Sequence, residues 1–271
     1  MKVHDKEMLK IGIFDSGLGG LTVVKALKEV IQNAHIYYVA DTANAPYGEK
    51  ASEQILQYSL DITQHLIDTH EIDALIVACN TATSSAIAHL RETYPSLIII
   101  GTEPGIKPAI EQTKTGKIGV LATPSTLEGD KYQQLATALA MQKDVTLFEQ
   151  ACPGLVEQIE KGEIDSVKTK ALLEKWLQPM RDNDVDTIVL GCTHYPLVGE
   201  TIKEIMLCNV TLVHTGEAIS KYLLNLALKQ GHLNEGDLST YVYSTGELEK
   251  NIVNKILQNP KTIHNITLSN K

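Results

Sequence analysis

Residues 74–81 read A-L-I-V-A-C-N-T, and residues 187–194 read T-I-V-L-G-C-T-H. In each stretch a continuous apolar run ends at a cysteine or one residue before it, and small polar residues follow. An uninterrupted apolar run of this length predicts a strand buried on both faces, as in a parallel sheet that helices cover on both sides. The two cysteines, Cys79 and Cys192, are therefore expected at the carboxyl ends of two similar strands.

A second pair of segments supports an internal repeat. Residues 10–13, K-I-G-I, resemble residues 117–120, K-I-G-V, and each member of this pair precedes one of the cysteine segments. Two corresponding pairs in the same order predict two similar α/β halves, each with one cysteine at a strand end.

Apolar strand-like runs alternate with amphipathic segments along the whole chain. We expect strands at residues 10–14, 35–40, 74–78, 97–100, 117–122, 145–149, 187–191, 211–214 and 241–244. We expect helices at residues 21–31, 52–69, 83–92, 127–140, 153–161, 167–181, 196–206, 217–228 and 248–257. This alternation predicts an α/β fold with parallel sheets. The expected domains are residues 1–103 with 215–271, and residues 104–214.

The composition excludes several classes of protein. The chain has 271 residues, 43% of them hydrophobic, and a net charge of −9, which argues against general binding to nucleic acid. No apolar run approaches the roughly 20 residues that a membrane helix needs. The first ten residues are polar and predict no signal peptide, so we expect a cytoplasmic protein that does not bind membranes.

Small polar turns follow several of the predicted strands. They are D-S-G at residues 15–17, C-N-T at 79–81, T-P-S-T at 123–126 and C-T-H at 192–194. Ligands of open α/β sheets bind at the carboxyl ends of strands, and the free N–H groups of a following helix bind anions. Because these turns contain no arginine, we expect backbone N–H groups and hydroxyls to bind a small substrate with two carboxylates.

Cys79 and Cys192 are the strongest candidates for catalysis. One cysteine at a strand end is usually a small buried apolar residue, but two in matching positions suggest a shared role. A thiol has a pKa near 8.5, and a helix N-terminus lowers it, so a thiol can take up or return a proton near neutral pH. Two thiols on opposite faces of one carbon would invert its configuration. Preorganised donors would stabilise the carbanion, and the candidates are Ser16, Asn80, Thr81 and Thr193.

Three further residues could assist the thiols or could be purely structural. Asp15 could hold a proton near one thiol or simply cap a turn, and His194 could serve the other thiol or simply pack. Glu160, taken singly, reads as a solvated charge on a helix. The other two cysteines, Cys152 and Cys208, read as structural.

Common cofactor and metal motifs are missing from the sequence. Residues 17–22, G-L-G-G-L-T, begin like a dinucleotide-binding loop, but Thr22 stands where the third glycine belongs. The sequence has neither H-E-x-x-H nor C-x-x-C, and Cys192 with His194 supplies too few ligands for structural zinc. We therefore expect no metal and no cofactor.

At these residues the sequence resembles the glutamate racemases of bacterial cell-wall synthesis, from about Ile11 to about Leu228. The matching segments are I-F-D-S-G-L-G-G-L at 13–21, Y-V-A-D at 38–41, P-Y-G at 46–48, A-C-N-T-A at 78–82, G-V-L-A-T at 119–123, A-C-P at 151–153 and L-G-C-T-H-Y-P-L at 190–197. Together and in this order they are highly specific.

The resemblance implies two α/β domains related by a pseudo-twofold axis, with the active site between them. It implies that Cys79 deprotonates D-glutamate with help from Asp15, and that Cys192 deprotonates L-glutamate with help from His194. It also implies that Glu160, eight residues after the cysteine of the A-C-P segment, is a third assisting carboxylate. It also implies a cytoplasmic enzyme that uses neither pyridoxal phosphate nor metal and supplies D-glutamate for peptidoglycan, and it allows a homodimer. The implied substrate contacts are Asp15, Ser16, Tyr47, Gly48, Asn80, Thr81, Thr193 and His194.

One departure and three alternatives accompany the resemblance. Residues 154–160 read G-L-V-E-Q-I-E, where many relatives have L-F-V-P-L-V-E, so the start of the helix that carries Glu160 could differ. The competing functions are an aspartate racemase or related two-cysteine isomerase, an amino-acid binding protein without catalysis, and a thiol redox protein. The first would share the two-thiol geometry, the second would not need the thiols, and the third lacks a C-x-x-C pair.

Overall fold

The chain folds into two compact units in a computed structural model that describes residues 8–143, 145–207, 209–258 and 260–268. One unit extends to Thr102 and resumes at Gly216, and the other comprises Glu103–Thr215. The expected boundaries, between residues 103 and 104 and between 214 and 215, each differ from these by one residue.

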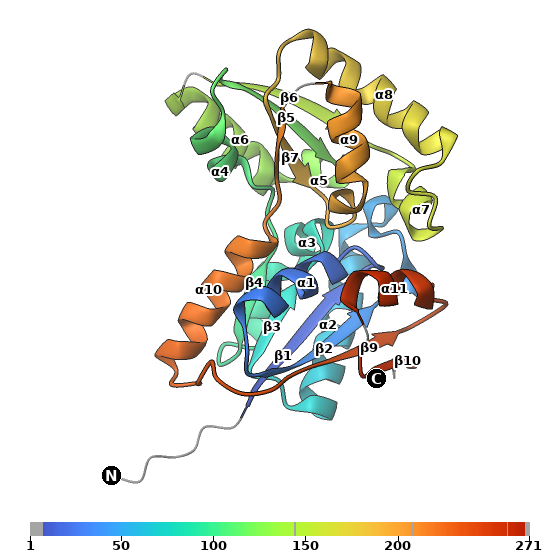
Figure 1. Ribbon diagram of the computed structural model, residues 1–271. Helices are drawn as coiled ribbons and strands as arrows, with labels where there is room; N and C mark the ends of the chain where they lie inside the picture. Colours follow the sequence, from blue (N-terminus) through green and yellow to red (C-terminus); the bar gives the residue numbers. More distant parts are fainter. Residues whose placement is uncertain (1–7, 144, 208, 259, 269–271) are drawn as a thin grey trace. The chain divides into compact units, whose positions relative to one another are not determined.

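The first unit is built on a six-stranded sheet in the order β10-β9-β2-β1-β3-β4, with every adjacent pair parallel (Figure 1). Its strands are β1 (Leu9–Asp15), β2 (Ala34–Ala40), β3 (Ala74–Val77), β4 (Ile98–Gly101), β9 (Leu238–Ser244) and β10 (Thr262–Asn265). Its helices are α1 (Leu21–Val30), α2 (Ser52–His70), α3 (Asn80–Thr93), α10 (Gly216–Lys229) and α11 (Lys250–Leu257), with short 3₁₀ helices η1 (Thr42–Asn44) and η2 (Tyr47–Glu49).

The second unit has a four-stranded parallel sheet in the order β6-β5-β7-β8. The strands are β5 (Lys117–Ala122), β6 (Thr146–Ala151), β7 (Thr187–Gly191) and β8 (Thr211–Val213). The helices are α4 (Ile106–Gln112), α5 (Pro124–Glu128), α6 (Asp130–Lys143), α7 (Leu155–Glu160), α8 (Val167–Asp182) and α9 (Gly199–Met206), with the 3₁₀ helix η3 (Tyr195–Val198) before α9.

The two sheets repeat one topology, down to the register. In the first sheet β1 lies between β2 and β3, and β4 lies beyond β3; β5, β6, β7 and β8 have the same arrangement. Ile11 of β1 pairs with Ala74 of β3, and Ile118 of β5 pairs with Thr187 of β7. The sequence repeat aligns these same residues, which confirms the prediction of two similar parallel α/β units.

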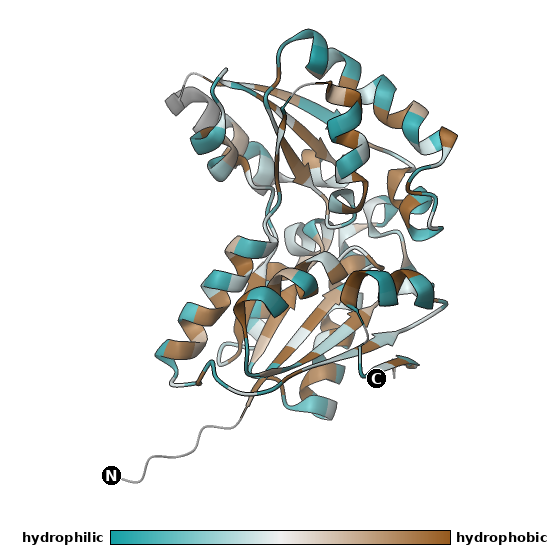
Figure 2. Ribbon diagram, in the orientation of Figure 1, coloured by the Kyte–Doolittle hydropathy of each residue, from teal (hydrophilic) through white to brown (hydrophobic). Residues whose placement is uncertain are grey.

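Alternating side chains in the second sheet build a core on each of its faces. Leu121, Ile188 and Leu190 pack with α7, α8 and α9, whereas the neighbouring Val120 and Val189 pack with α4 and α6. Successive side chains of a strand point to opposite faces, so a strand covered on both sides must be apolar throughout. Figure 2 shows the apolar colour along the central strands and polar residues on the outer faces of the helices.

Several elements differ from the sequence prediction. Helix α3 begins at Asn80 rather than at Thr83, residues 127–140 belong to two helices, and α9 follows a 3₁₀ helix instead of beginning at Pro196. Helix α4 and strand β10 were not predicted. Helix α4 has a proline in its first turn and only seven residues, and the four residues of β10 alternate poorly. No helix in the described part of the chain is long and apolar enough to cross a membrane.

Candidate active site

The first unit gathers the predicted site residues at the carboxyl ends of adjacent strands. Asp15 is the last residue of β1, and Cys79 lies two residues after β3 ends. Both are buried, and the backbone N–H of Ala78 donates to the Phe14 carbonyl at 2.8 Å, which joins the two strand ends. The position agrees with the rule that ligands of parallel sheets bind at this edge.

The loop after β1 fixes the Asp15 carboxylate. The Gly20 N–H, at the start of α1, donates to Asp15 Oδ2 at 2.6 Å. A helix N-terminus stabilises a carboxylate placed against it. Ser16, in the same loop, is 6% exposed, and the Tyr38 hydroxyl donates to the Gly17 carbonyl at 2.5 Å. The loop is thereby held against β2.

Cys79 itself caps α3. Its Sγ accepts from the Ala82 N–H at 3.5 Å, so the thiol, not a hydroxyl or an amide, serves as the N-cap. Asn80 and Thr81 consequently lie in the first helical turn, where we had expected a loop. Asn80 Oδ1 is buried without a hydrogen-bond partner among the described residues, which leaves it able to bind a ligand.

Tyr47 brings a phenol to the same place. Its hydroxyl donates to Asp41 Oδ2 at 2.5 Å. Burial raises the pKa of Tyr47 well above 10, and the charge and hydrogen bond of Asp41 add to this, as do the charges of Cys79 and Asp15. Tyr47 therefore lies close to both candidate groups, and Gly48 follows it in η2.

Asp41 was not among the predicted site residues, although it follows β2 directly. Its carboxylate is fully buried and accepts from Tyr47, from Asn44 Nδ2 at 3.1 Å and from Thr245 Oγ1 at 2.6 Å. The strand-end rule that selected Asp15 and Cys79 would have selected it too.

In the second unit, Cys192, His194 and Glu160 form a hydrogen-bonded chain. Cys192 follows β7 directly, and its Sγ lies 3.6 Å from His194 Nδ1. His194 Nε2 lies 2.5 Å from Glu160 Oε1. Thr193 stands between the other two residues of the turn and is largely buried. In such a chain the carboxylate orients the imidazole, and the imidazole can exchange a proton with the thiol.

The electrostatics of this chain favour a protonated histidine. Burial by itself would lower the pKa of His194, but the hydrogen bonds to Cys192 and Glu160 and their negative charges raise it well above 6.5. An imidazolium beside a thiol favours the thiolate.

The turn that carries Cys192 differs from the predicted one. It leads into the 3₁₀ helix η3, and His194 makes no side-chain cap there. We had expected a helix N-terminus to assist this thiol, as at Cys79. The charged partner here is His194.

Glu160 is not the solvated helix charge that its sequence position alone suggested. It is the last residue of α7, which begins after Gly154 in a left-handed conformation with φ of 81°. Its side chain is 22% exposed and reaches the almost fully buried His194. The changed sequence before Glu160 therefore still places its carboxylate on the histidine.

Two further buried residues lie beside Cys192. Cys152 follows β6, its thiol donates to the Gln150 carbonyl at 3.5 Å, and burial followed by the charge of Cys192 raises its pKa to about 12. Tyr195 is fully buried against both sulfurs. Cys79, Cys152 and Cys192 are free thiols, and Cys208 lies outside the described residues. We find no group of three histidine, cysteine or carboxylate side chains in the described chain that could hold a metal.

Comparisons with known proteins agree with this architecture. The Asp/Glu/hydantoin racemase family matches residues 18–223. A glutamate racemase of Sulfurovum sp. is 63% identical over 249 residues, covering 92% of this chain and 94% of the relative, and one of Aliarcobacter butzleri is 59% identical over 93% and 96%.

Solved structures of glutamate racemases share the fold. One from Bacillus anthracis superimposes with a TM-score of 0.85 at 29% identity, covering 98% of this chain and 99% of the other. One from Escherichia coli, in complex with L-glutamate and the activator UDP-MurNAc-Ala, gives 0.86 at 26% identity and covers 97% and 99%. The chain therefore belongs to the Asp/Glu/hydantoin racemase family and, within it, to the glutamate racemases.

Proposed function

We propose that this chain interconverts L- and D-glutamate without a cofactor, with Cys79 and Cys192 as the two bases. The observation that carries the proposal is the equivalence of the two thiols. Each follows the third strand of a sheet whose order and register are repeated in the other unit. Cys192 has the buried His194 at 3.6 Å, and in the first unit the charges of Cys79 and Asp15 both act on the buried Tyr47.

The reaction moves one proton at each thiol. In the L-to-D direction, the Cys192 thiolate removes the proton from the α-carbon, and the Cys79 thiol donates its proton to the opposite face. The cycle leaves Cys192 as a thiol and Cys79 as a thiolate, and exchange with water restores the starting state. The reverse direction begins at Cys79. The mechanism requires both sulfurs to reach the same α-carbon in the substrate complex.

Neighbouring groups support each thiol in this scheme. His194, held by Glu160, stabilises the Cys192 thiolate, and Asp15 assists proton exchange at Cys79. Seven residues besides Asp15 are proposed to contact the substrate, and Asn80 offers a buried acceptor for its ammonium group. These contacts are Ser16, Tyr47, Gly48, Asn80, Thr81, Thr193 and His194.

The remaining elements of the proposal concern the cell. We propose a cytoplasmic enzyme whose D-glutamate supplies peptidoglycan synthesis, and a homodimer as its assembly. Depleting the protein should then make growth depend on added D-glutamate. Sedimentation of the purified chain should give twice the monomer mass.

A chiral assay tests the reaction and its two bases together. Purified protein with L-glutamate, reductant and no cofactor should produce D-glutamate, whereas Cys79→Ser and Cys192→Ser should each remove the activity. L-Aspartate alongside distinguishes an aspartate racemase. Binding without inversion would favour a binding protein, and ready formation of a Cys79–Cys192 disulfide in a chain that inverts neither substrate would favour a redox protein.

Deuterated water tests the use of two bases on opposite faces. Each enantiomer should acquire deuterium at the α-carbon chiefly as the other enantiomer forms. Rapid entry of label into the starting enantiomer before inversion would indicate a single base.

A further inference from the structure

The two units hold a buried tyrosine beside their thiols in different ways. In the first unit, the Tyr47 hydroxyl donates to the Asp41 carboxylate at 2.5 Å. In the second, the Tyr195 hydroxyl is buried and makes no hydrogen bond of regular geometry to any described residue, although it interacts with the Cys152 thiol. The phenol hydrogen is thus held firmly in one unit and loosely in the other.

Asp41 and Cys152 occupy equivalent positions. Each follows the second strand of its sheet, and each backbone N–H donates to the last residue of the first strand: Asp41 to the Asp15 carbonyl at 2.9 Å, and Cys152 to the Ala122 carbonyl at 3.0 Å. A carboxylate is a strong hydrogen-bond acceptor, whereas a neutral thiol is a weak one. The raised pKa of Cys152, about 12, keeps that thiol neutral.

Tyr195 also packs in the same buried cluster as Cys192. The Tyr195 N–H donates to the Cys192 carbonyl at 3.1 Å, a 3₁₀-type turn in which the side chains of the first and fourth residues overlie each other. Both side chains belong to one buried cluster, and the charge of Cys192 acts on the phenol more strongly than any other neighbour.

We propose that Tyr195 is a positioning residue for Cys192. While Cys192 is protonated, the Tyr195 hydroxyl interacts with the Cys152 thiol. Once Cys192 becomes a thiolate, the hydroxyl donates a hydrogen bond to the Cys192 sulfur. A hydroxyl hydrogen rotates about its C–O bond, and a thiolate is a far better acceptor than a neutral thiol. The inference rests on Cys192 being one of the two bases.

Other charged groups near Cys192 and Tyr195 also affect the ionisation of these two side chains. His194 approaches Cys192 from the turn, and Glu160 acts through that histidine. Glu157, on α7, has a buried Oε2 without a hydrogen-bond partner in the described chain, and its charge opposes ionisation of the phenol. Tyr195 therefore remains a neutral donor throughout.

Alkylation of Cys192 measures its thiolate population without any substrate. Iodoacetamide labelling of the full chain is followed across pH, and mass spectrometry of peptides separates Cys192 from Cys79. Tyr195→Phe should raise the pH midpoint for Cys192 by about one unit, the effect of one hydrogen bond to a charged acceptor. At about pH 7 labelling should slow only about threefold, because a less stabilised thiolate is more nucleophilic. Cys79 serves as the internal control and should keep its midpoint.

Cys152→Ala should act in the opposite direction. It removes the resting acceptor and leaves the hydroxyl to Cys192 alone, so the Cys192 midpoint should fall. An unchanged midpoint in Tyr195→Phe, or a rise in both variants, would overturn the proposal. If Tyr195→Phe does not fold, Cys152→Ala decides by itself: a fall supports the proposal, and any other result refutes it. Because labelling uses no glutamate, a failed racemase assay of the unchanged chain would refute the proposed function separately.

Discussion

Replacing Glu160 by glutamine tests the chain that links Cys192, His194 and Glu160. The carboxylate lies 2.5 Å from His194 Nε2, and its hydrogen bond and charge help to raise the pKa of that histidine. Glutamine keeps the size of the side chain and still offers an oxygen, but it carries no charge. The imidazolium then loses its counter-charge, so we expect the Cys192 thiolate to be less populated and catalysis to slow.

The size of the effect follows from the exposure of the two partners. A hydrogen bond to a charged group contributes about 1.5–3 kcal/mol. His194 is almost fully buried, but the Glu160 side chain is 22% exposed, so solvent screens part of its charge. The lower end of the range applies, and about 1.5 kcal/mol corresponds to roughly a tenfold fall in kcat/KM.

Isotope effects locate the loss at one thiol. Because the equilibrium constant of a racemisation is unity, kcat/KM must fall equally in both directions. The slower step, however, is proton transfer at Cys192, which comes first for L-glutamate and second for D-glutamate. The primary isotope effect should therefore rise with α-deuterated L-glutamate and fall with α-deuterated D-glutamate.

The control is Glu200→Gln, which removes an exposed carboxylate of the same unit that pairs with Lys203 at 2.9 Å. It should change neither rate nor isotope effects, because exposed pairs contribute little. The reasoning fails if Glu160→Gln retains full activity. It also fails if the two isotope effects change together, since that would indicate a general distortion.

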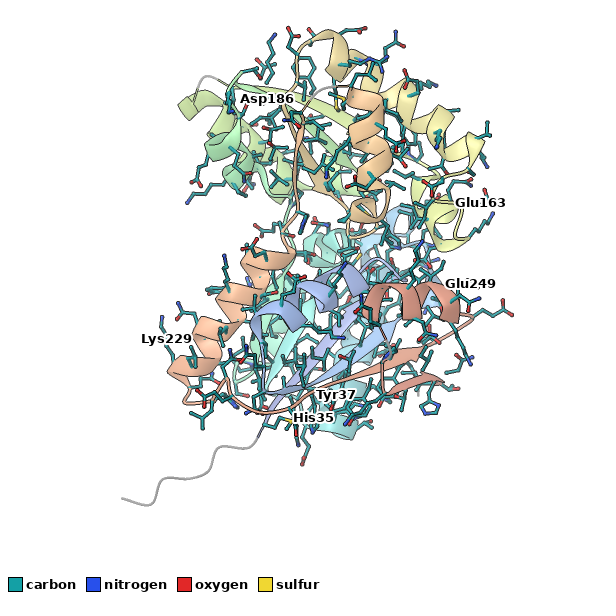
Figure 3. All side chains as sticks on the ribbon, viewed as in Figure 1. His35, Tyr37, Glu163, Asp186, Lys229 and Glu249 are labelled. Atoms are coloured by element: carbon teal, nitrogen blue, oxygen red, sulfur yellow. The ribbon has the colours of Figure 1, made fainter. Side chains whose placement is uncertain are left out.

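Three further predictions concern the packing around Asp15 and the stability of the fold. Gly20→Ala should lower activity and cost about 1–3 kcal/mol in chemical denaturation, because an added Cβ would lie 2.7 Å from the Asp15 Cβ; unchanged unfolding would contradict this packing. Burial and neighbouring positive charges lower the pKa of His70, which stacks on Tyr37 (labelled in Figure 3) at 3.9 Å, so the folded state resists its protonation. The contribution of His70 to the free energy of unfolding should be complete above about pH 6.5 and should fall as the pH drops below that value. His70→Gln should therefore make the melting temperature depend less on pH in this range. Asp186→Asn should lower the melting temperature by the equivalent of about 1–3 kcal/mol, because this carboxylate accepts at 2.6–2.9 Å from three groups of residues 113–115; an unchanged melting point would count against it.

The sequence was sufficient to predict that Asp15, Cys79 and Cys192 lie at the ends of parallel strands. A short uninterrupted apolar run bounded by turn residues is typical of a strand covered on both faces, and a polar residue directly after such a strand lies at the edge of the sheet. This reasoning placed Asp15, Cys79 and Cys192 correctly at strand ends. The same rule also fits Asp41, which follows β2 directly but was not chosen from the sequence. It could not select Tyr195, which begins η3 and does not follow β7 directly.

Contacts between distant elements were not predictable from the same patterns. Glu160 lies 34 residues before His194, and nothing in the spacing of α7 indicates which face its carboxylate occupies. The resemblance to known racemases indicated that Glu160 assists catalysis but not which residue it contacts, and only the fold shows its contact with His194. The predicted start of α3 was also wrong. Because cysteine is not a usual N-cap, the helix was predicted to begin at Thr83 instead of at Asn80.

Although the two units share one topology, a negative charge on each sulfur is stabilised in a different way. Cys79 caps a helix of 14 residues, whose N-terminal dipole favours a negative charge on the sulfur. Cys192 precedes a 3₁₀ helix of only four residues. Its sulfur is stabilised instead by the buried imidazolium of His194, which Glu160 holds in place. A dipole is permanent, whereas an imidazolium can lose its proton. A rise in pH should therefore weaken the support of Cys192 before that of Cys79, and above the pKa of His194 the isotope effect with α-deuterated L-glutamate should grow relative to that with the D-enantiomer. An equal change for both enantiomers would show that the two thiols share one titrating group.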